Sequence, residues 1–247
     1  MKRLLEWQIG TVKTISKETA RAKTFTLALP NWQRHKPGQH YDVRLTAPDG
    51  YQAQRSYSIA SEPERSGEID LTVELIEDGE VSSYMHDVLV AGDLVEVRGP
   101  IGGYFVWEAS MGKPILLVAG GSGIVPLMSM IRHRAAVGST IPARLLYSSR
   151  TPEDVIYSAE LMRLKDSQDG LGIAFTFTRQ APAGWTGYAR RIDAQMLGEV
   201  AGPLGREVQA FVCGPTLMVE AVADELLQIG LAPNQIRTER FGPTGGN

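Results

Sequence analysis

One short stretch, Arg55-Ser56-Tyr57-Ser58-Ile59-Ala60-Ser61, combines a cation, a phenol ring and three hydroxyls. It ends an alternating apolar and polar run, which predicts a strand leading into a loop. The guanidinium can pair with a phosphate, the phenol can lie against a flat heterocycle, and the hydroxyls can reach polar ring edges. The stretch therefore indicates a flavin site, although an ordinary amphipathic strand with a serine-rich turn explains the same residues.

The glycine-rich stretch Ala119-Gly120-Gly121-Ser122-Gly123 is the second candidate site. It directly follows the apolar run of residues 115–118 and precedes a helical pattern over about residues 125–136. Backbone amides in such a loop can face an anion, and the N-terminus of the helix adds favourable partial charge. Pro126 occupies the third glycine position of the dinucleotide fingerprint, so the pattern predicts a phosphate-bearing ligand, with a turn that merely permits tight packing as the alternative.

Two further sites follow later strands of the same kind. Ser149 and Arg150 end the expected strand over residues 143–147, where an arginine accommodates the additional phosphate of NADP. Cys213-Gly214-Pro215 closes the strand over residues 209–212, at the edge where open α/β sheets bind ligands. The Gly-Pro pair predicts a turn that exposes Cys213, whereas a lone cysteine is otherwise a small buried hydrophobe. Further positive charge near Arg150 is available from Arg179, Arg190 and Arg191.

A glycine also opens the stretch Gly79-Glu80-Val81-Ser82-Ser83. Ser82 is the expected N-cap of a short helix, and the amides beyond it could take a diphosphate. An ordinary capped helix explains the same residues. The four histidines lack ligand spacing with one another, so no metal site is predicted.

The elements that must position these sites change character along the chain. Alternating apolar sets around residues 25–29, 41–45, 71–75 and 95–97, separated by Pro and Gly turns, predict an antiparallel β-barrel. Beyond residue 110, continuous apolar runs alternate with helical patterns, including residues 158–165 and 216–228, with a strand over residues 173–178. These predict a doubly wound α/β domain with a parallel sheet. We therefore expect a barrel domain over residues 1–110 and an α/β domain over residues 111–247.

Composition narrows the functional class. The 247 residues are 43% hydrophobic and 21% charged, with a net charge of −3 and no long basic run, which disfavours nucleic acid. Residues 1–6 meet charge before any signal-peptide core, and no apolar run approaches a membrane span. Cys213 is the only cysteine, so this sequence alone holds no disulfide and no cysteine-ligated iron–sulfur cluster. A cytoplasmic protein is expected.

Taken together, these motifs resemble the ferredoxin–NADP reductase superfamily, in particular the flavin and nicotinamide reductase components of bacterial oxygenase systems. The resemblance covers nearly the whole chain and rests on the order and spacing of the motifs. They are Arg55 to Ser58, Gly79 to Ser83, Gly99-Pro100-Ile101-Gly102, Gly120 to Pro126, Cys213-Gly214-Pro215 and Glu239-Arg240-Phe241.

The resemblance implies a role for each matching residue. For FAD it implies that Arg55 contacts the phosphate, Tyr57 packs along the ring, and Ser58 lies near the nitrogen that accepts hydride. The remaining FAD-binding candidates are Ser56, Val73, Gly79, Val81, Ser82, Ser83 and Phe241. For NAD(P) the candidates are Gly120, Gly121, Ser122, Gly123, Ser149, Arg150, Arg179, Cys213, Gly214 and Pro215. Ser58, Cys213 and Glu239 form the implied catalytic set.

Three positions depart from the family pattern. Val125 stands where many relatives have threonine, which puts one nicotinamide contact in doubt. Glu74 lies where relatives often have a basic residue. Phe241 is the aromatic nearest to the terminal tyrosine of the plant-type enzymes, and stacking on the flavin and packing in a core both remain open.

The implied function is a flavin-dependent NAD(P)H oxidoreductase, an enzyme that passes hydride from NADPH, or NADH, to FAD. Single electrons would then leave for a separate ferredoxin or other metalloprotein. A reductase of free flavin and a non-catalytic FAD-binding subunit are the alternatives. Arg34, His35 and Lys36 are a candidate basic docking face, which a solvated loop explains as well. Nothing in the sequence indicates an oligomeric state.

Overall fold

The computed structural model describes residues 5–166 and 169–242. Residues 1–4, on which the expected absence of a signal peptide partly rests, and residues 243–247 lie outside that description. Within the described chain, two compact units are present. Unit 1 comprises residues 5–108 and 128–136, and unit 2 comprises residues 109–127, 137–166 and 169–242.

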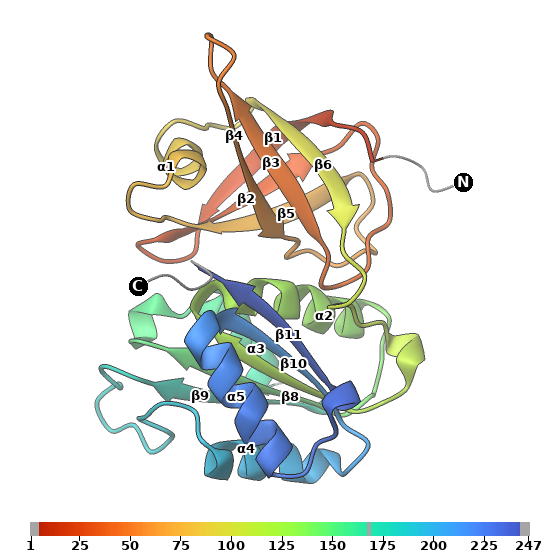
Figure 1. Cartoon of the computed structure of the whole chain (residues 1–247), viewed down its shortest axis with the longest axis vertical. Helices are drawn as coiled ribbons and strands as arrows, with labels where there is room; N and C mark the ends of the chain where they lie inside the picture. Colours follow the sequence, from red (N-terminus) through yellow and green to blue (C-terminus); the bar gives the residue numbers. More distant parts are fainter. Residues whose placement is uncertain (1–4, 167–168, 243–247) are drawn as a thin grey trace. The chain divides into compact units, whose positions relative to one another are not determined.

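Unit 1 is a six-stranded antiparallel sheet (Figure 1, red to yellow). Its strands follow the order β4-β3-β6-β1-β2-β5. The residues directly after β4 meet the middle of the other edge strand, β5, since Ile59 bridges Leu71 and the Ala60 amide donates to the Asp70 carbonyl at 2.8 Å. The sheet thus curls into the predicted barrel. The elements are β1 (Gln8–Lys17), β2 (Ala22–Ala28), β3 (His40–Thr46), β4 (Gln52–Ser58), β5 (Glu68–Glu74), α1 (Glu80–Asp87) and β6 (Leu94–Ile101).

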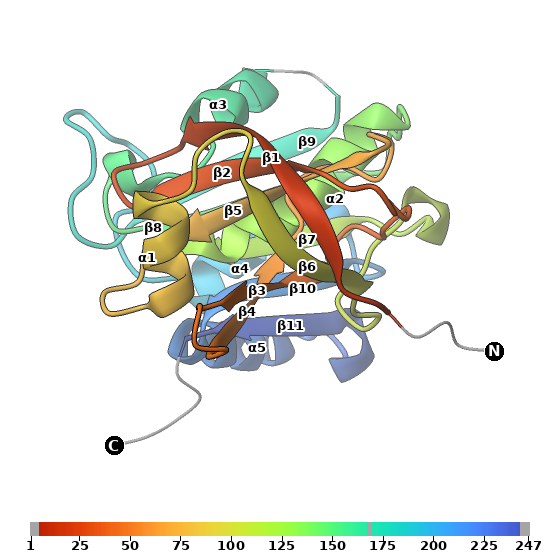
Figure 2. The same ribbon diagram turned by 90° about the horizontal axis from the view of Figure 1, so that it is seen from above.

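The barrel interior is built from the alternating apolar positions. Phe25, Tyr41, Leu71 and Val97 are completely buried in one cluster, each contributed by a different strand. Strand β1 was not predicted, because it buries few apolar side chains and its sequence carries no clean alternation. Helix α1 packs against β3, β4 and β5 and is seen beside these strands in Figure 2.

Unit 2 is a five-stranded parallel sheet with the strand order β11-β10-β7-β8-β9. This is the doubly wound order, and β7 and β10 flank the point where the chain reverses its direction of growth across the sheet. The predicted α/β fold is confirmed. The strands are β7 (Ile115–Gly120), β8 (Ala143–Ser149), β9 (Leu171–Phe177), β10 (Gln209–Pro215) and β11 (Ile236–Phe241). The helices are α2 (Ile124–Ala136), α3 (Ser158–Asp166), α4 (Ala194–Ala201) and α5 (Thr216–Gln228).

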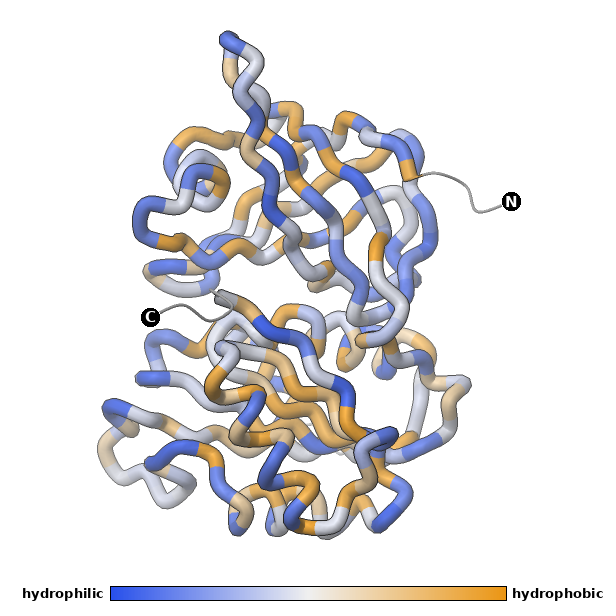
Figure 3. The backbone as a smooth tube through the Cα atoms, in the orientation of Figure 1, coloured by the Kyte–Doolittle hydropathy of each residue, from blue (hydrophilic) through white to orange (hydrophobic). Residues whose placement is uncertain are grey.

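Burial explains the different sequence texture of the two sheets. Every residue of β7 is buried, so its run is continuously apolar, and Figure 3 shows the central strands of unit 2 as hydrophobic tracts. Helices α4 and α5 cover one face of this sheet through Leu197, Val219 and Leu226. Helix α5 has the predicted bounds, whereas β11 and α4 were not predicted. No described helix is long and apolar enough to cross a membrane.

Candidate functional site

The first candidate motif occupies strand β4 and the residues after it. Tyr57 is half-buried against the barrel core, and burial raises the pKa of its phenol to about 12. Arg55 is exposed, and its Nη1 donates to its neighbour's carbonyl, that of Gln54, at 2.7 Å. Among the described residues the Arg55 guanidinium makes no ion pair, so its charge is available to an anion. Ser58 is 6% exposed.

Ser56 belongs to the opposite face of β4. Its hydroxyl donates to the Asp42 carboxylate at 2.7 Å, and Arg98 donates to the same carboxylate at 2.7 Å. Burial raises the pKa of Asp42, but the hydrogen bonds from Arg98 and Ser56 outweigh it and leave the pKa below its usual value. The Ser56 hydroxyl therefore supports the strand pair β3–β4 in this structure.

Folding brings the N-terminus of α1 to the same part of unit 1 as β4. The Tyr51 hydroxyl, just before β4, donates to the Glu80 carboxylate at 3.0 and 3.1 Å. The charge of Arg55 acts on that same phenol. A guanidinium and the positive end of a helix are the groups that bind phosphate, so the two motifs can act on one diphosphate.

The predicted N-cap at Ser82 is wrong, since α1 begins at Glu80 with Gly79 at the N-cap position. Ser82 is buried inside the first turn, where its hydroxyl donates to the Gly79 carbonyl at 3.2 Å and accepts from the Ile76 amide at 3.2 Å. It therefore fixes the loop before the helix. A Cβ on Gly79 would lie 2.5 Å from Ser82 Oγ and 3.0 Å from the Ile76 carbonyl oxygen. Glycine at this position therefore lets the loop pack closely against Ser82 and Ile76 at the start of the helix.

Three other predicted FAD-binding positions differ in exposure. The side chains of Val73 and Val81 are buried in the barrel core. The Val73 carbonyl lies 2.9 Å from Nε2 of His86, so both the side chain and the carbonyl of Val73 already have partners within the protein. Ser83 is half-buried, and its amide donates to the Gly79 carbonyl at 2.9 Å. Contact with a ligand at this turn would come mainly from main-chain atoms.

In unit 2 the glycine stretch forms a tight turn between β7 and α2. Gly121 has φ +54°, a left-handed conformation that other residues rarely adopt, and a Cβ there would meet open space. Gly123 is glycine for a different reason, because a Cβ would lie 2.0 Å from the Cys213 carbonyl oxygen. At Gly120 a Cβ would meet Sδ of Met218 at 2.3 Å. The turn therefore packs directly on the end of β10.

This packing joins two predicted sites at one edge of the sheet. The glycine turn follows β7, and Cys213-Gly214-Pro215 ends β10, so both stand at the carboxyl ends of the strands that flank the switch point. That is where open α/β sheets bind their ligands. Helix α2 begins at Ile124, directly after the turn, and directs the positive end of its dipole to the same edge.

Cys213 and Glu239 are cross-strand neighbours on β10 and β11. The prediction that Gly-Pro would expose Cys213 is wrong, because the residue is completely buried. Strand β10 continues through Pro215, paired with β11, and the Gly123 turn packs over the Cys213 carbonyl. Burial, and secondly the charge of Glu239, raise the pKa of the thiol well above its usual value. Cys213 is therefore a neutral thiol and not a nucleophilic thiolate.

Two arginines gather at the carboxyl ends of β8 and β9. Arg150 and Arg179 are exposed, and the Arg179 amide donates to the Arg150 carbonyl at 3.0 Å. In the described parts of the chain neither guanidinium forms an ion pair. Ser149 is 5% exposed and donates its hydroxyl to the Thr151 carbonyl at 3.1 Å. The pair is suited to an added phosphate.

The other two arginines differ from this pair. Arg190 donates from Nε to the Asp193 carboxylate at 2.6 Å, and that carboxylate also caps α4 by accepting from the Met196 amide at 2.9 Å. Arg190 therefore stabilises the start of α4. Arg191 is exposed.

Tyr147 supports the glycine turn and was not singled out from the sequence. Its hydroxyl donates to the Gly121 carbonyl at 3.0 Å and accepts from the Ile156 amide at 3.3 Å. Its place at the end of β8, beside Ser148 and Ser149, was visible in the sequence, but its partners lie elsewhere in the chain. Val125 is buried, and Phe241 is half-buried at the end of β11.

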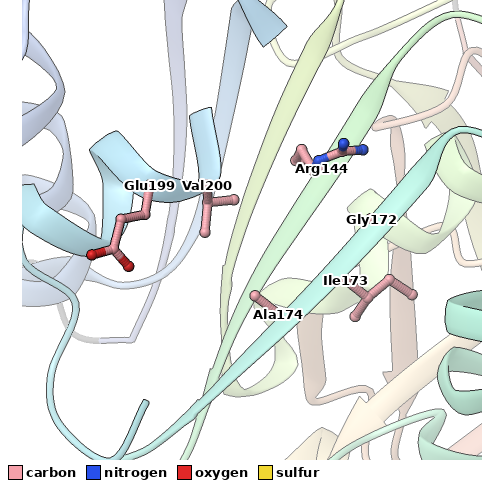
Figure 4. Close-up of a pocket in the computed structure, with 6 residues that line it drawn as sticks. All are labelled: Arg144, Gly172, Ile173, Ala174, Glu199 and Val200. Atoms are coloured by element: carbon pink, nitrogen blue, oxygen red, sulfur yellow. The ribbon is translucent and has the colours of Figure 1, made fainter. Parts of the chain in front are cut away.

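A shallow pocket of about 220 Å³ lies at the other end of the unit 2 sheet (Figure 4). Arg144 and Gly172 line it near the starts of β8 and β9, together with Glu199 of α4. This is the amino edge of the strands, so the pocket is distinct from the carboxyl-edge site. No group of three or more potential metal ligands is found among the described residues.

Two family models match successive parts of the chain. Residues 7–106 match the family described as an oxidoreductase FAD-binding domain, and residues 117–224 match an oxidoreductase NAD-binding domain. The chain is 32% identical to ferredoxin–NADP reductase B of Sorangium cellulosum over 234 residues, which cover 93% of this chain and 91% of that protein.

A second relative is longer than this chain. The glycine betaine monooxygenase reductase subunit of Pseudomonas aeruginosa is 32% identical over 210 residues, which cover 85% of this chain but 57% of the relative. The chain thus spans little more than half of that protein. In fold, it resembles the flavohem-like FAD/NAD binding domain of nitric oxide dioxygenase from Vibrio cholerae, with a TM-score of 0.85, 22% identity, and coverage of 96% of this chain and 99% of that one.

Proposed function

Because this chain belongs to the ferredoxin–NADP reductase family, we propose that it is an FAD-dependent NAD(P)H reductase that delivers electrons to a separate acceptor protein. The observation that carries the proposal is the packing of the glycine turn on the end of β10, at the switch point of the parallel sheet. That edge has the main-chain amides and the helix end that bind a dinucleotide diphosphate.

The residues of unit 1 fit FAD on structural grounds. Arg55 is an exposed cation without an ion pair in the described chain, and α1 begins nearby at Glu80, after a loop that Gly79 allows to pack tightly. We assign the FAD diphosphate to Arg55 and the first amides of α1, and the flavin ring to Tyr57 and Ser58. FAD, when bound, would accept hydride from the nicotinamide and release the two electrons singly.

The protein residues would orient the reactants and set the electrostatics. In unit 2 the amides of the Gly120–Gly123 turn would hold the nicotinamide dinucleotide. Tyr147 would stabilise this turn through its hydrogen bond to the Gly121 carbonyl. Cys213 and Glu239 would offer a neutral thiol and a carboxylate side by side at the same edge. In unit 1, Ser58 is the residue that we propose to act on the flavin. None of the three needs to form a covalent intermediate.

The separate acceptor is supported by what the relatives are called. They include reductase components of glycine betaine monooxygenase, propane monooxygenase and naphthalene dioxygenase systems. The single cysteine of this sequence rules out a cysteine-ligated cluster held by these 247 residues alone. We propose a ferredoxin or a related metalloprotein as the acceptor. We place the protein in the cytoplasm, since a chain with one cysteine has no internal disulfide to maintain.

Anaerobic rapid mixing of the FAD-loaded protein with NADPH, and separately with NADH, tests the proposal. Fast loss of the oxidised flavin absorbance, followed by reoxidation on addition of a [2Fe–2S] ferredoxin, is the expected result. Turnover with free FMN and none with any protein carrier would favour a free-flavin reductase. If neither nucleotide reduces the bound flavin, the remaining interpretation is a non-catalytic FAD-binding subunit.

We further propose that NADPH is preferred, because Arg150 and Arg179 together offer two cations to its additional phosphate. Arg150→Ala is expected to lower kcat/KM for NADPH about tenfold or more, the effect of losing one charge-assisted hydrogen bond. Activity with NADH should change little. Arg163→Ala, which replaces an exposed arginine of α3, is the matched control. Equal losses with both nucleotides would argue against the assignment.

A further inference from the structure

Residues 128–136 of α2 belong to unit 1. Polar side chains in this part of the helix contact the segment that directly follows strand β4. Ser129 is completely buried, and its hydroxyl donates to the Ser61 carbonyl at 2.7 Å. Arg132, one turn later, donates from Nη1 to the Ala60 carbonyl at 2.9 Å. The spacing of three residues places both donors on one face of the helix.

The same segment is held from two other elements. Nε2 of His35 lies 3.0 Å from the Ser61 carbonyl oxygen, which can only accept, so this nitrogen carries the proton. From β5, the Asp70 amide donates to the Ser61 hydroxyl at 3.0 Å, and the Asp70 carbonyl accepts from the Ala60 amide at 2.8 Å. The carbonyls of Ala60 and Ser61 thus have dedicated side-chain donors.

These bonds begin where the β-ladder stops. Strand β4 ends at Ser58, and the main-chain pairing beyond it is reduced to the Ile59–Leu71 bridge and two amide hydrogen bonds, from Ile59 to the Gln39 carbonyl at 2.9 Å and from Ala60 to the Asp70 carbonyl at 2.8 Å. The side-chain donors at the Ala60 and Ser61 carbonyls add to these main-chain bonds, and together they set the path of the chain after Tyr57 and Ser58. A shift there would move the two residues assigned to the flavin ring, which lie only two to four positions earlier.

Core packing alone does not require these donors. Helix α2 already anchors itself through Met128, Met130 and Ile131, which are at most 2% exposed. A buried hydroxyl and a guanidinium add stability only if both find partners, and both are aimed at main-chain carbonyls. Their common target is a segment that needs a defined position.

We propose that Ser129 and Arg132 are positioning residues for the flavin, acting through the carbonyls of Ser61 and Ala60. This inference rests on the proposed FAD site and extends it to a helix that begins at the nucleotide edge. The two side chains touch main chain and not the flavin, so their effect is on the geometry of Tyr57 and Ser58.

The test measures FAD binding and not turnover. Ser129→Ala and Arg132→Met are prepared as apoprotein and titrated with FAD, with the Kd taken from quenching of flavin fluorescence. The visible circular dichroism of bound flavin and its midpoint potential are measured in parallel. Each variant is expected to weaken FAD roughly tenfold and to change the flavin dichroism, the scale of one lost buried hydrogen bond. Arg132→Lys, which keeps a donor, should recover part of the loss.

A control separates positioning from stability. Thr24→Val removes a buried hydroxyl that is 2.7 Å from Thr72 Oγ1 in the same unit. It should lower Tm while leaving the FAD Kd and dichroism unchanged. Wild-type Kd and dichroism in both helix variants would overturn the inference, whatever their Tm. If Ser129→Ala does not fold, the Arg132→Met and Arg132→Lys pair decides. Failure of the proposed function is seen separately, in wild-type protein that NAD(P)H does not reduce.

Discussion

At the scale of single residues, environment decides what a side chain can do. Arg55 and Arg34 are both exposed arginines of unit 1, but Arg34 is paired with Glu64. Lys36 is likewise paired, with Glu108 at 2.6 Å. His35, between them in sequence, is 2% exposed. The burial of His35 removes it from the predicted basic docking face, whereas Arg34 and Lys36 are exposed side chains paired with carboxylates, and a docking role for these two stays a prediction.

Replacing Arg55 is expected to weaken the binding of FAD strongly. Arg55→Gln removes the charge while keeping a polar side chain, and the loss of a charge-assisted bond to phosphate is worth about 1.5–3 kcal/mol. FAD affinity should fall about tenfold to a hundredfold. Arg163→Gln, an exposed arginine of α3, is the matched control. Isothermal titration with FAD gives both values, and equal affinities would remove Arg55 from the site.

His35 should make the stability of the protein depend on pH. Burial lowers its pKa from 6.5 to about 4, despite the opposing hydrogen bond to Ser61. Between these values the unfolded chain binds a proton that the folded protein does not, so stability falls as pH drops below 6.5. The loss approaches about 1.4 kcal/mol per pH unit.

Urea unfolding of wild type and His35→Gln at pH 7, 6 and 5 measures this slope. Glutamine keeps a donor for the Ser61 carbonyl but does not titrate, so its free energy of unfolding should fall less steeply. Carboxylates titrate alike in both proteins and cancel in the comparison. Parallel slopes would show that His35 is not the responsible group.

At the scale of elements, the turn between β7 and α2 is specified by two different constraints. Gly123 is needed for space, since a Cβ would meet the Cys213 carbonyl oxygen at 2.0 Å. Gly121 is needed for its conformation, at φ +54° with open space around it. Sequence showed the glycines as one motif and could not separate these causes.

Alanine at each position should separate them. Gly123→Ala forces two backbones apart and is expected to cost about 3 kcal/mol or more in stability, with loss of NADP⁺ binding. Gly121→Ala should cost only about 1–2 kcal/mol, the price of a left-handed residue. Thermal unfolding and NADP⁺ titration of both variants check the order. A more severe effect at Gly121 would contradict it.

At the scale of the whole molecule, the chain is not divided at one point. Helix α2 starts in unit 2, and its residues 128–136 count with unit 1. The domain boundary near residue 110 stays a prediction. It does not account for the assignment of residues 128–136, which follow this boundary, to unit 1. Because Ser61, Ala60 and Glu64 all bond to α2, the barrel depends on a segment that lies beyond that boundary.

A fragment of residues 1–110 is therefore expected to be a poor barrel. It lacks the donors from Ser129, Arg132 and His133, and the Met130 side chain that packs near Gly38. It should bind an apolar dye and unfold without a sharp transition, as monitored by circular dichroism. A cooperative transition at the Tm of the full chain would show that the barrel is independent of α2.

The hydrophobic periodicity of the chain predicts both classes of sheet, since burial on one face or on both leaves different periodicities. It also located α5 at residues 216–228 and the motifs at β4, β7 and β10. The sequence did not predict strands β1 and β11 or helix α4, because their hydrophobic patterns are short or mixed. Their formation depends on partners that local pattern does not reveal.

Which groups meet depends on how distant segments of the chain pack together. Cys213 is buried because β11 and the Gly123 turn pack around it. Ser82 lies inside the first turn of α1, where it hydrogen-bonds the preceding loop, because the helix begins two residues earlier. The hydroxyl of Ser129 reaches a carbonyl that is 68 positions away in the sequence. Local propensity acts over a few residues, whereas burial and hydrogen bonding between distant segments depend on how the whole chain packs.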